Sequence, residues 1–316
     1  MSFGKRTEFI LLTIVTVLLT ICATLPVSLF SFLCTAGVSA IIGYAATKYH
    51  YGYVASLSLV CVAVLFFFAG DVMSAIYTLL PTILCGLSLG ICKNLSVSPV
   101  KAIVSMSVIK VFSLTATMKL LNFATDDTET FDELLFSTGD VYKEFLSASY
   151  GTSVSEAEIN AIISESISLI KALMPSVMII ISILFALLCY YLFKRICTAR
   201  KEDVTMLTPF CEWRAEKSIG IIFLVILIFG RFIPQDTVFH AAFMNVNIVM
   251  IFVFFLLGLS LAEYILKKHM QNYYLRKLIL FGILIVSLFM AIPAFVLAIF
   301  GAIDAVWDFR ARFKTR

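Results

Sequence analysis

Long apolar runs separated by short polar segments fill the chain from Phe9 to Ile303. A helix needs about 20 mostly apolar residues to cross a bilayer, and it must satisfy its own backbone hydrogen bonds there. The pattern predicts an all-α fold, a polytopic transmembrane helix bundle with about nine spans, or eight as the alternative. The predicted spans cover residues 8–25, 27–47, 52–70, 72–92, 102–123, 168–194, 217–233, 239–265 and 277–303.

Lysines and arginines predict the orientation of these spans. They gather in the N-terminal segment and after spans two, four, six and eight, whereas Lys143 and Arg231 lie on the other side. Cytoplasmic loops of membrane proteins carry an excess of basic residues. We therefore expect a multi-pass protein whose N-terminus is cytoplasmic and whose residues 196–216 form a cytoplasmic linker.

Residues 124–166 then lie outside and carry ten of the chain's 20 acidic residues. Two Ser/Thr-x-x-Glu sequences, starting at Thr130 and Ser155, fit the capping box that begins a helix. Apolar residues follow each at helical spacing, so we expect the second helix to continue into span six with a kink at Pro175. A solvated cap and a lid that gathers cations both remain open. The expected external hairpin has helices over 131–149 and 156–170 and a turn at Tyr150-Gly151.

The C-terminal tail gives conflicting signals. Nine spans place residue 304 onward outside, but the four bases of the tail favour the cytoplasm. Either the last apolar stretch breaks at Pro293 and folds back, or the tail is an interfacial helix outside. We favour nine spans, with a helix continuing from Ala302 to about Arg312. Asp304, Asp308 and Arg312 then share one face and form structural ion pairs that anchor the last span.

Composition excludes several classes of protein. The chain is 61% hydrophobic and 14% charged, against roughly 25% charged residues in soluble domains. The net charge of +4 comes from short loops, so we expect no nucleic-acid partner. The eight cysteines form no CxxC pair and are expected to be small buried side chains. The three histidines are far apart, so no metal site and no cofactor are expected.

The sequence GLSLG, from Gly86 to Gly90, matches both a G-x-S-x-G nucleophile pattern and a GxxxG packing pattern. It lies inside span four, away from any strand-to-helix elbow. We therefore interpret it as helix packing, and small residues of span two, Ala36, Ser39 and Gly43, give the same signal. No catalytic residue is identified, and we expect no enzyme.

Three polar residues within spans are candidates for binding. Lys110 lies near the centre of span five, where a charge is costly and indicates a functional site, although a structural partner inside the bundle is equally open. Asn245 and Asn247 lie in span eight. Asparagines in lipid bond to neighbouring helices, and these two either line a substrate pocket or hold helices together.

Four stretches of the chain carry a family resemblance: the tail pattern Gly301-x-x-Asp304-x-x-x-Asp308-Phe309-Arg310, "LMPSVMIIISILFALLCYYLFKRI" (173–196), "NVNIVMIFVFFLLGLSLAEYIL" (245–266) and, less clearly, "TPFCEWRAEK" (208–217). They resemble the YybS-like family of bacterial membrane proteins. The resemblance covers most of the chain and implies a location in the bacterial cytoplasmic (plasma) membrane. The family is distantly similar to the S-components of energy-coupling-factor transporters.

The resemblance implies a six-helix, S-component-like membrane domain over 1–195, followed by the linker and by a three-helix extension over 217–316. S-components bind a small molecule near the outer face. We therefore expect a small-molecule-binding transport subunit with a polar cavity between spans four and six. Coupling to an energising module is not expected, because the first span lacks alanines spaced by four. The alternative is a non-transporting scaffold or regulatory protein that binds membrane partner proteins through loops 195–217 and 267–277.

Overall fold

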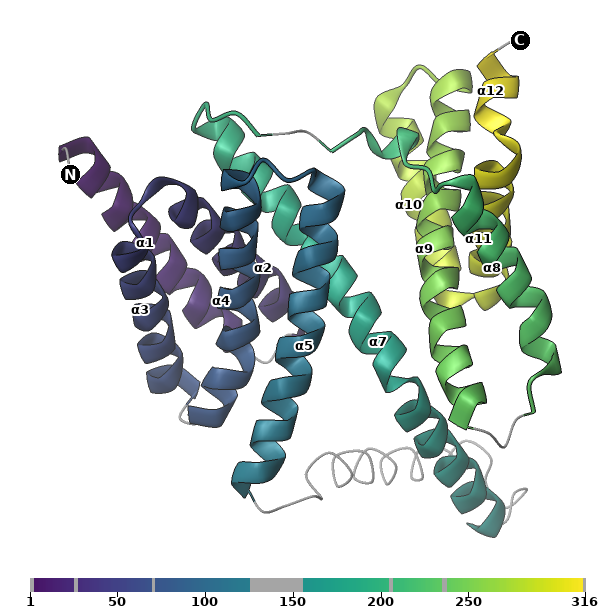
Figure 1. Cartoon of the computed structure of the whole chain (residues 1–316), viewed down its shortest axis with the longest axis horizontal. Helices are drawn as coiled ribbons and strands as arrows, with labels where there is room; N and C mark the ends of the chain where they lie inside the picture. Colours follow the sequence, from purple (N-terminus) through teal and green to yellow (C-terminus); the bar gives the residue numbers. More distant parts are fainter. Residues whose placement is uncertain are drawn as a thin grey trace. The chain divides into compact units, whose positions relative to one another are not determined.

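The computed structural model describes residues 3–25, 28–69, 72–125, 156–204, 207–234 and 238–314, and every regular element in these ranges is helical (Figure 1). The all-α prediction is confirmed. The helices are α1 (Phe3–Ala23), α2 (Ser28–Lys48), α3 (Tyr51–Ala69), α4 (Val72–Asn94), α5 (Pro99–Thr125), α7 (Glu156–Ala199), η2 (Phe210–Glu212), α8 (Lys217–Phe229), η3 (Gly230–Phe232), α9 (Val238–His269), α10 (Tyr273–Phe289), α11 (Ala291–Trp307) and α12 (Phe309–Lys314).

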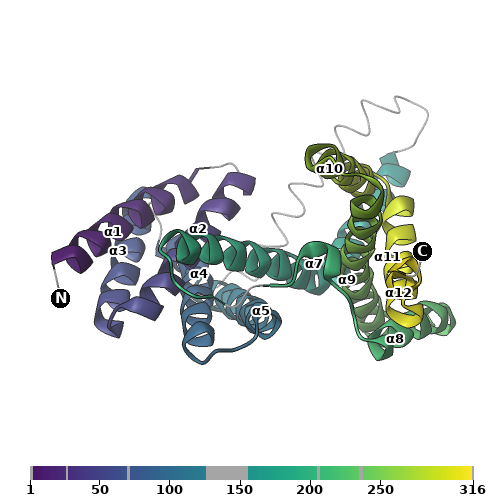
Figure 2. The ribbon, with the colours of Figure 1, turned by 90° about the horizontal axis from the view of Figure 1, so that it is seen from above.

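Two compact units divide the described chain. Unit 1 comprises Met1–Ile167 with Ile181–Leu207, and unit 2 comprises Ser168–Ile180 with Thr208–Arg316. Helix α7 contributes to both, as its continuous ribbon in Figure 2 shows. We describe each unit by itself.

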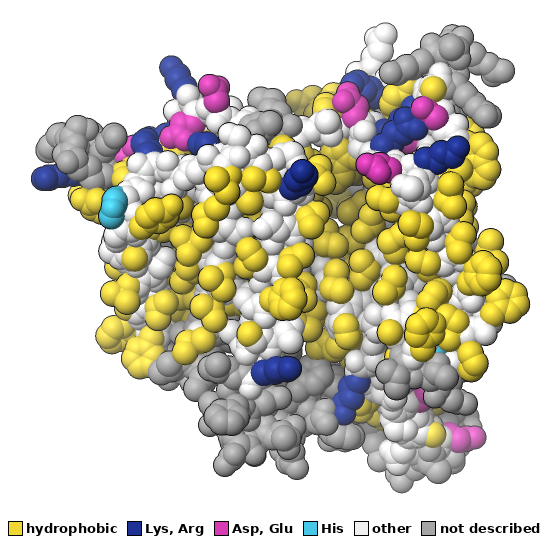
Figure 3. All heavy atoms as spheres, viewed as in Figure 1, with side chains coloured by type: hydrophobic (Ala, Val, Ile, Leu, Met, Phe, Trp, Pro, Cys, Tyr) yellow, Lys and Arg dark blue, Asp and Glu magenta, His cyan; other side chains and the backbone are white. Residues whose placement is uncertain are grey.

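The helices have the length and surface of membrane spans. Six of them, α1, α2, α3, α5, α7 and α9, are long and apolar enough to cross a bilayer, while the apolar stretches Thr78–Asn94 of α4 and Lys217–Phe229 of α8 are shorter. Large apolar side chains such as Phe67 and Phe112 are exposed, and Figure 3 shows apolar side chains over much of the surface, with charged side chains near the ends of the helices. An apolar surface of this extent belongs in lipid. The chain is therefore a polytopic helical membrane protein.

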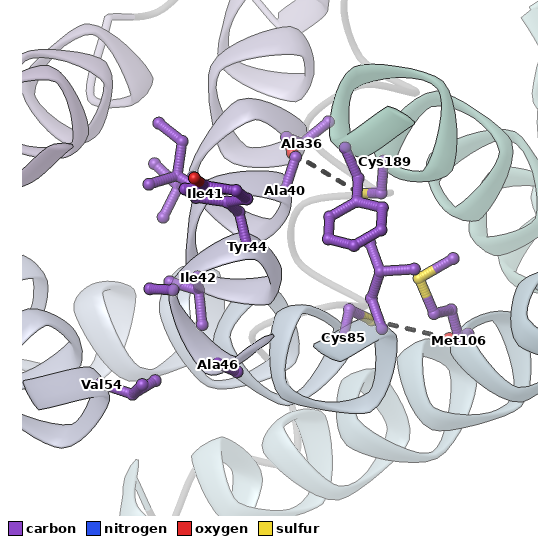
Figure 4. Close-up of a cluster of buried hydrophobic side chains, with 14 of the residues drawn as sticks. Ala36, Ala40, Ile41, Ile42, Tyr44, Ala46, Val54, Cys85, Met106 and Cys189 are labelled. Atoms are coloured by element: carbon purple, nitrogen blue, oxygen red, sulfur yellow. Dashed lines mark hydrogen bonds between the residues drawn. The ribbon is translucent and has the colours of Figure 1, made fainter. Parts of the chain in front are cut away.

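Unit 1 is built around the contact between α2 and α4. Ala36, Ala40 and Ile42 are buried on α2, and Cys85 of α4 and Met106 of α5 join the same cluster (Figure 4). Small residues along α2 let the neighbouring helices approach closely, which is how helices associate where lipid supplies no hydrophobic drive.

Ion pairs join four segments at one end of unit 1. The Nζ atom of Lys48 lies 2.7 Å from Oε2 of Glu8, and Nζ of Lys93 lies 2.6 Å from Oε2 of Glu202. Arg200 approaches Glu8 at 3.7 Å. The start of α1, the ends of α2 and α4 and the segment after α7 therefore share one side of the unit, as their basic residues predicted.

Helix α7 runs without interruption for 44 residues from Glu156 to Ala199 and contains Pro175. The prediction that a helix over 156–170 continues into span six is confirmed. The expected helix over 131–149 and the turn at Tyr150-Gly151 lie outside the described residues.

In unit 2, helices α8, α9 and α11 pack around Phe223 and Phe254, whose rings stack at 4.4 Å between centroids. Gly301 allows α11 to lie against α9, since a Cβ there would be 2.3 Å from the carbonyl oxygen of Phe254. The two backbones therefore touch, and a larger residue at Gly301 would separate the helices.

The last predicted span, 277–303, is instead two helices. Helix α10 ends at Phe289, α11 begins at Ala291, and the two are bent by 118°. Met290 between them has an extended backbone, with φ −126° and ψ 118°. The break lies three residues before Pro293, which occupies the first turn of α11, where its missing N–H costs no helical hydrogen bond.

Candidate functional site

The most densely bonded charged group of unit 2 is Arg310, in the C-terminal tail. Its Nε atom lies 2.8 Å from Oδ2 of Asp304, and the two side chains are only 6% and 2% exposed. Burial of both charges requires further hydrogen bonds to the guanidinium group. The local fold supplies them from the linker and from α9.

Backbone carbonyls of the linker complete the coordination of Arg310. Its Nη1 donates to the carbonyl oxygen of Cys211, and its Nη2 donates to that of Trp213 at 2.9 Å. Nη2 also donates to Oγ of Ser260 on α9 at 3.1 Å. Ser260 in turn donates to the carbonyl oxygen of Phe210 at 2.6 Å. One arginine thus holds α11, α9 and the linker together.

Asp308 ends α11 in the left-handed region, with φ 49° and ψ 58°. The expected unbroken helix from Ala302 to Arg312 is therefore wrong at Asp308, because a right-handed helix cannot contain this conformation, which Asp tolerates better than most residues. The Asp308 carboxylate accepts a hydrogen bond from the N–H of Ala311, at the start of α12, and pairs with Arg214 at 2.9 Å.

The predicted partner of the two aspartates was Arg312, and its side chain lies outside the described residues. Among the described side chains, Asp304 pairs with Arg310, and Asp308 pairs with Arg214. The break at Asp308 changes the direction of the chain, so α12 no longer continues the face that carries Asp304. For Asp304, helical spacing therefore did not single out Arg310, and the pairing of Asp308 with Arg312 stays a prediction.

The same contacts correct the expected side of the tail. Nine spans placed residue 304 onward across the membrane from the linker over 196–216. Hydrogen bonds from Arg310 to Cys211 and Trp213 require the tail and the part of the linker that belongs to unit 2 to lie on one side. The bend between α10 and α11 returns the chain to that side, as the fold-back alternative required. The excess of basic residues in the tail agrees with this placement.

Lys110 is buried in unit 1, with 8% of the residue exposed. Its Nζ atom lies 4.1 Å from the centroid of the Phe185 ring on α7. Cys85 and Cys189 are its electrostatic neighbours, and their thiols donate to the backbone carbonyls of Met106 and Ala36 (Figure 4). Within the described residues, no ion pair joins Lys110 to an acidic side chain. An ammonium group is thus held among α4, α5 and α7 by an aromatic ring rather than by a carboxylate.

A shallow groove of unit 1 is lined by Tyr51, Leu59 and other side chains of α3 and α4, and its lining does not include Lys110. This groove is almost entirely apolar, as expected of a surface covered by lipid chains. The polar cavity expected between spans four and six therefore stays a prediction.

The two asparagines of α9 have different surroundings, both within unit 2. Asn245 accepts from the N–H of Ser176 at 2.8 Å and donates to the carbonyl oxygen of Ala172 at 2.7 Å. In a regular helix the N–H of Ser176 would donate to the carbonyl oxygen of Ala172. The Asn245 side chain therefore bonds to both groups of this helical hydrogen bond of α7, next to Pro175. Asn245 therefore holds two helices together. Asn247 has a buried Oδ1 with no hydrogen-bond partner among the described residues.

A protein-family model described as "Predicted membrane protein (DUF2232)" matches residues 11–305. The chain belongs to the DUF2232 family. The membership supports an integral membrane protein in a lipid bilayer, and it gives the family no ligand or partner. No curated protein and no solved structure matches this DUF2232 chain. The resemblance to the YybS-like family and to S-components stays a prediction.

In this DUF2232 protein, Gly86 and Gly90 lie on the face of α4 that contacts α2. A Cβ at Gly86 would be 2.6 Å from the carbonyl oxygen of Ser39, and one at Gly90 would be 2.6 Å from Cβ of Ala46. Ser88, between them, has its Oγ 3.3 Å from Oγ of Ser105 on α5. The described contacts of the GLSLG sequence are therefore contacts between helices.

Sequence reasoning missed three groups that the structure joins to Arg310: Ser260 and the carbonyls of Cys211 and Trp213. Backbone carbonyls carry no signal in a sequence. Ser260 did carry a signal, because a hydroxyl three residues before Glu263 lies on the same helical side as that charged residue and can contact other polar groups. Its partner could not be named from the sequence.

Proposed function

We propose that this protein is a membrane subunit that binds a small anionic molecule in unit 1 and serves in its transport. The observation that carries the proposal is Lys110, an amine that is 8% exposed and has no acidic partner among the described residues. Placing a lysine at the centre of a membrane helix costs roughly 2.5–3.5 kcal/mol. An anionic ligand offsets this cost by supplying the missing counter-charge.

The surroundings of Lys110 favour a ligand that is small and partly apolar. The Phe185 ring covers one side of the amine, and Ser182, one helical turn before Phe185, is fully buried with no hydrogen-bond partner for its Oγ among the described residues. A carboxylate or phosphate would supply the counter-charge that Lys110 lacks among the described residues. The resemblance to S-components, which bind small molecules, also supports this function, although only by analogy.

The scaffold alternative required loops 195–217 and 267–277 to be free for partner proteins. Part of the first loop is held within unit 2, because the carbonyls of Cys211 and Trp213 accept hydrogen bonds from Arg310. These contacts favour a structural role for residues 211–213. We therefore place the ligand-binding function first.

Thermal melting of the purified protein with small carboxylates and phosphates tests the proposal, each compared with its neutral amide or alcohol analogue. A ligand at 100 times its dissociation constant stabilises the folded state by about 2.7 kcal/mol. We expect an acid to raise the melting temperature while its neutral analogue does not.

The variant Lys110→Met should lose this response, and Lys110→Arg should keep part of it because it keeps the charge. Lys119→Met is the matched control, since Lys119 is exposed on the same helix. An unchanged response of Lys110→Met to the same acid would refute the proposed site.

A further inference from the structure

We propose that unit 2 binds a single-chain lipid that carries a hydroxyl group, in a groove between α8, η3, α9 and α11, with Asn247 as the acceptor of the hydroxyl hydrogen. This site is separate from Lys110 and does not depend on the function proposed for unit 1.

The groove has a volume of about 640 Å³. Ligand pockets in proteins have volumes of roughly 300–1,000 Å³ and are mostly apolar, with a few polar groups that orient the ligand. Of the ten described residues that line this groove, nine are apolar side chains or glycine, and the tenth is Asn247. None of the ten carries a charge. The lining therefore suits a hydrocarbon chain and does not suit a charged head group.

Asn247 supplies the specific contact. Its Oδ1 is buried and has no hydrogen-bond partner among the described residues, although it lies within the span formed by α9. Water is absent from the hydrocarbon region of a bilayer, so an acceptor there needs a donor from protein or ligand. Asn245, only two residues earlier, has such donors and acceptors on α7. The contrast indicates that the donor for Asn247 comes from a bound molecule.

The wall of the groove is formed by close packing at Gly230. A Cβ at Gly230 would lie 2.4 Å from Cε1 of Phe243, so the Phe243 ring rests directly on this glycine. Ile228 and Phe232, on either side of Gly230, line the groove and are largely exposed, so a chain can enter from the surrounding lipid. The occupant follows from these observations: it has one apolar chain that enters sideways and one neutral donor that reaches Asn247.

Photolabelling of the full-length protein in detergent tests the proposal. The two probes are a 16-carbon alcohol with a diazirine in its chain and the methyl ether of the same alcohol, which cannot donate a hydrogen bond. We expect the alcohol to label peptides from α8, η3 and the first half of α9 about fivefold more than the ether does, the factor that one neutral hydrogen bond supplies.

Two variants locate the effect. Asn247→Leu keeps a similar volume and removes the acceptor, so it should label equally with both probes. Val246→Leu is the control, because Val246 is exposed on the same helix and does not line the groove. Equal labelling of the wild-type protein by the two probes would show that any acyl chain fills the groove, and it would overturn the proposal. A retained preference for the alcohol in Asn247→Leu would overturn the role of Asn247.

Discussion

Replacing Arg310 with methionine removes the group that holds the tail, the linker and α9 together. The variant loses the ion pair to Asp304 at 2.8 Å and the hydrogen bonds to Trp213 at 2.9 Å and to Ser260 at 3.1 Å. It also leaves the Asp304 carboxylate, 2% exposed, without its partner. Methionine fills much of the volume, so the loss is mainly electrostatic.

Breaking a buried ion pair by removing one partner costs about 3–5 kcal/mol. With an unfolding entropy of about 2.1 cal/mol/K per residue, one kcal/mol corresponds to roughly 1.5 °C in the melting temperature of this 316-residue chain. Arg310→Met should therefore lower the melting temperature by about 6 °C. Fluorescence-detected size-exclusion chromatography after heating measures the shift on the full-length protein in detergent.

Two further variants separate burial from charge. Arg214→Met removes an ion pair to Asp308 in which both side chains are exposed, 35% and 48%, so it should cost at most about 1 kcal/mol. The double variant Asp304→Leu, Arg310→Met should melt higher than Arg310→Met, because no buried charge is left alone. A melting temperature of Arg310→Met within about 1.5 °C of the wild type corresponds to a loss of less than about 1 kcal/mol, and it would show that the buried network does not hold the unit.

Two more predictions concern packing and topology. Gly90→Ala should destabilise the protein by about 1–3 kcal/mol through overpacking, because its Cβ would be 2.6 Å from Cβ of Ala46, whereas Gly282→Ala, with nothing within 4 Å, should not lower the melting temperature. In a cysteine-free background, Ala311→Cys and Lys268→Cys should react with an impermeant maleimide from the same side, and Phe239→Cys from the other, because the 32 residues of α9 exceed the membrane thickness. Reaction of positions 311 and 239 from one side would contradict the fold-back of α10 and α11.

The helices of the protein could be predicted well from its sequence, because an apolar run that crosses a membrane must satisfy its own backbone hydrogen bonds, and a helix does so within one segment. The predicted span over 27–47 became α2 (Ser28–Lys48), and that over 239–265 became α9 (Val238–His269). The break at Met290 was harder to place. Pro293 signalled it, but a proline is tolerated in the first turn of a helix, so the chain breaks before the proline rather than at it.

The tail shows why pairing is harder to predict than helices. Periodicity assumed that α11 continued, and on that assumption Arg312 faced Asp308. A single residue in the left-handed region, Asp308, invalidated the assumption. Apart from Asp304, the partners of Arg310 are 50 to 99 residues away in the sequence, and two of these three are backbone carbonyls. Local spacing contains no information about such contacts.

From the sequence, only the position of Lys110 within a span could be predicted, and not the side chains around it. A charge in the middle of a span could be recognised from the sequence, but the ring of Phe185, which lies on another helix, could not be. Whether the charge has an acidic partner depends on the packing of α4, α5 and α7, and helices in membranes can rotate about their axes without changing their apolar pattern.

Mass spectrometry of small molecules that copurify with the protein tests the central claim most directly. Wild type, Lys110→Met and Lys119→Met are purified in parallel from the same cells, and their extracts are compared in negative-ion mode. We predict one small anion that is retained by the wild type and by Lys119→Met and is missing from Lys110→Met. Equal amounts of every anion in the three extracts would contradict the claim that Lys110 binds an anionic ligand.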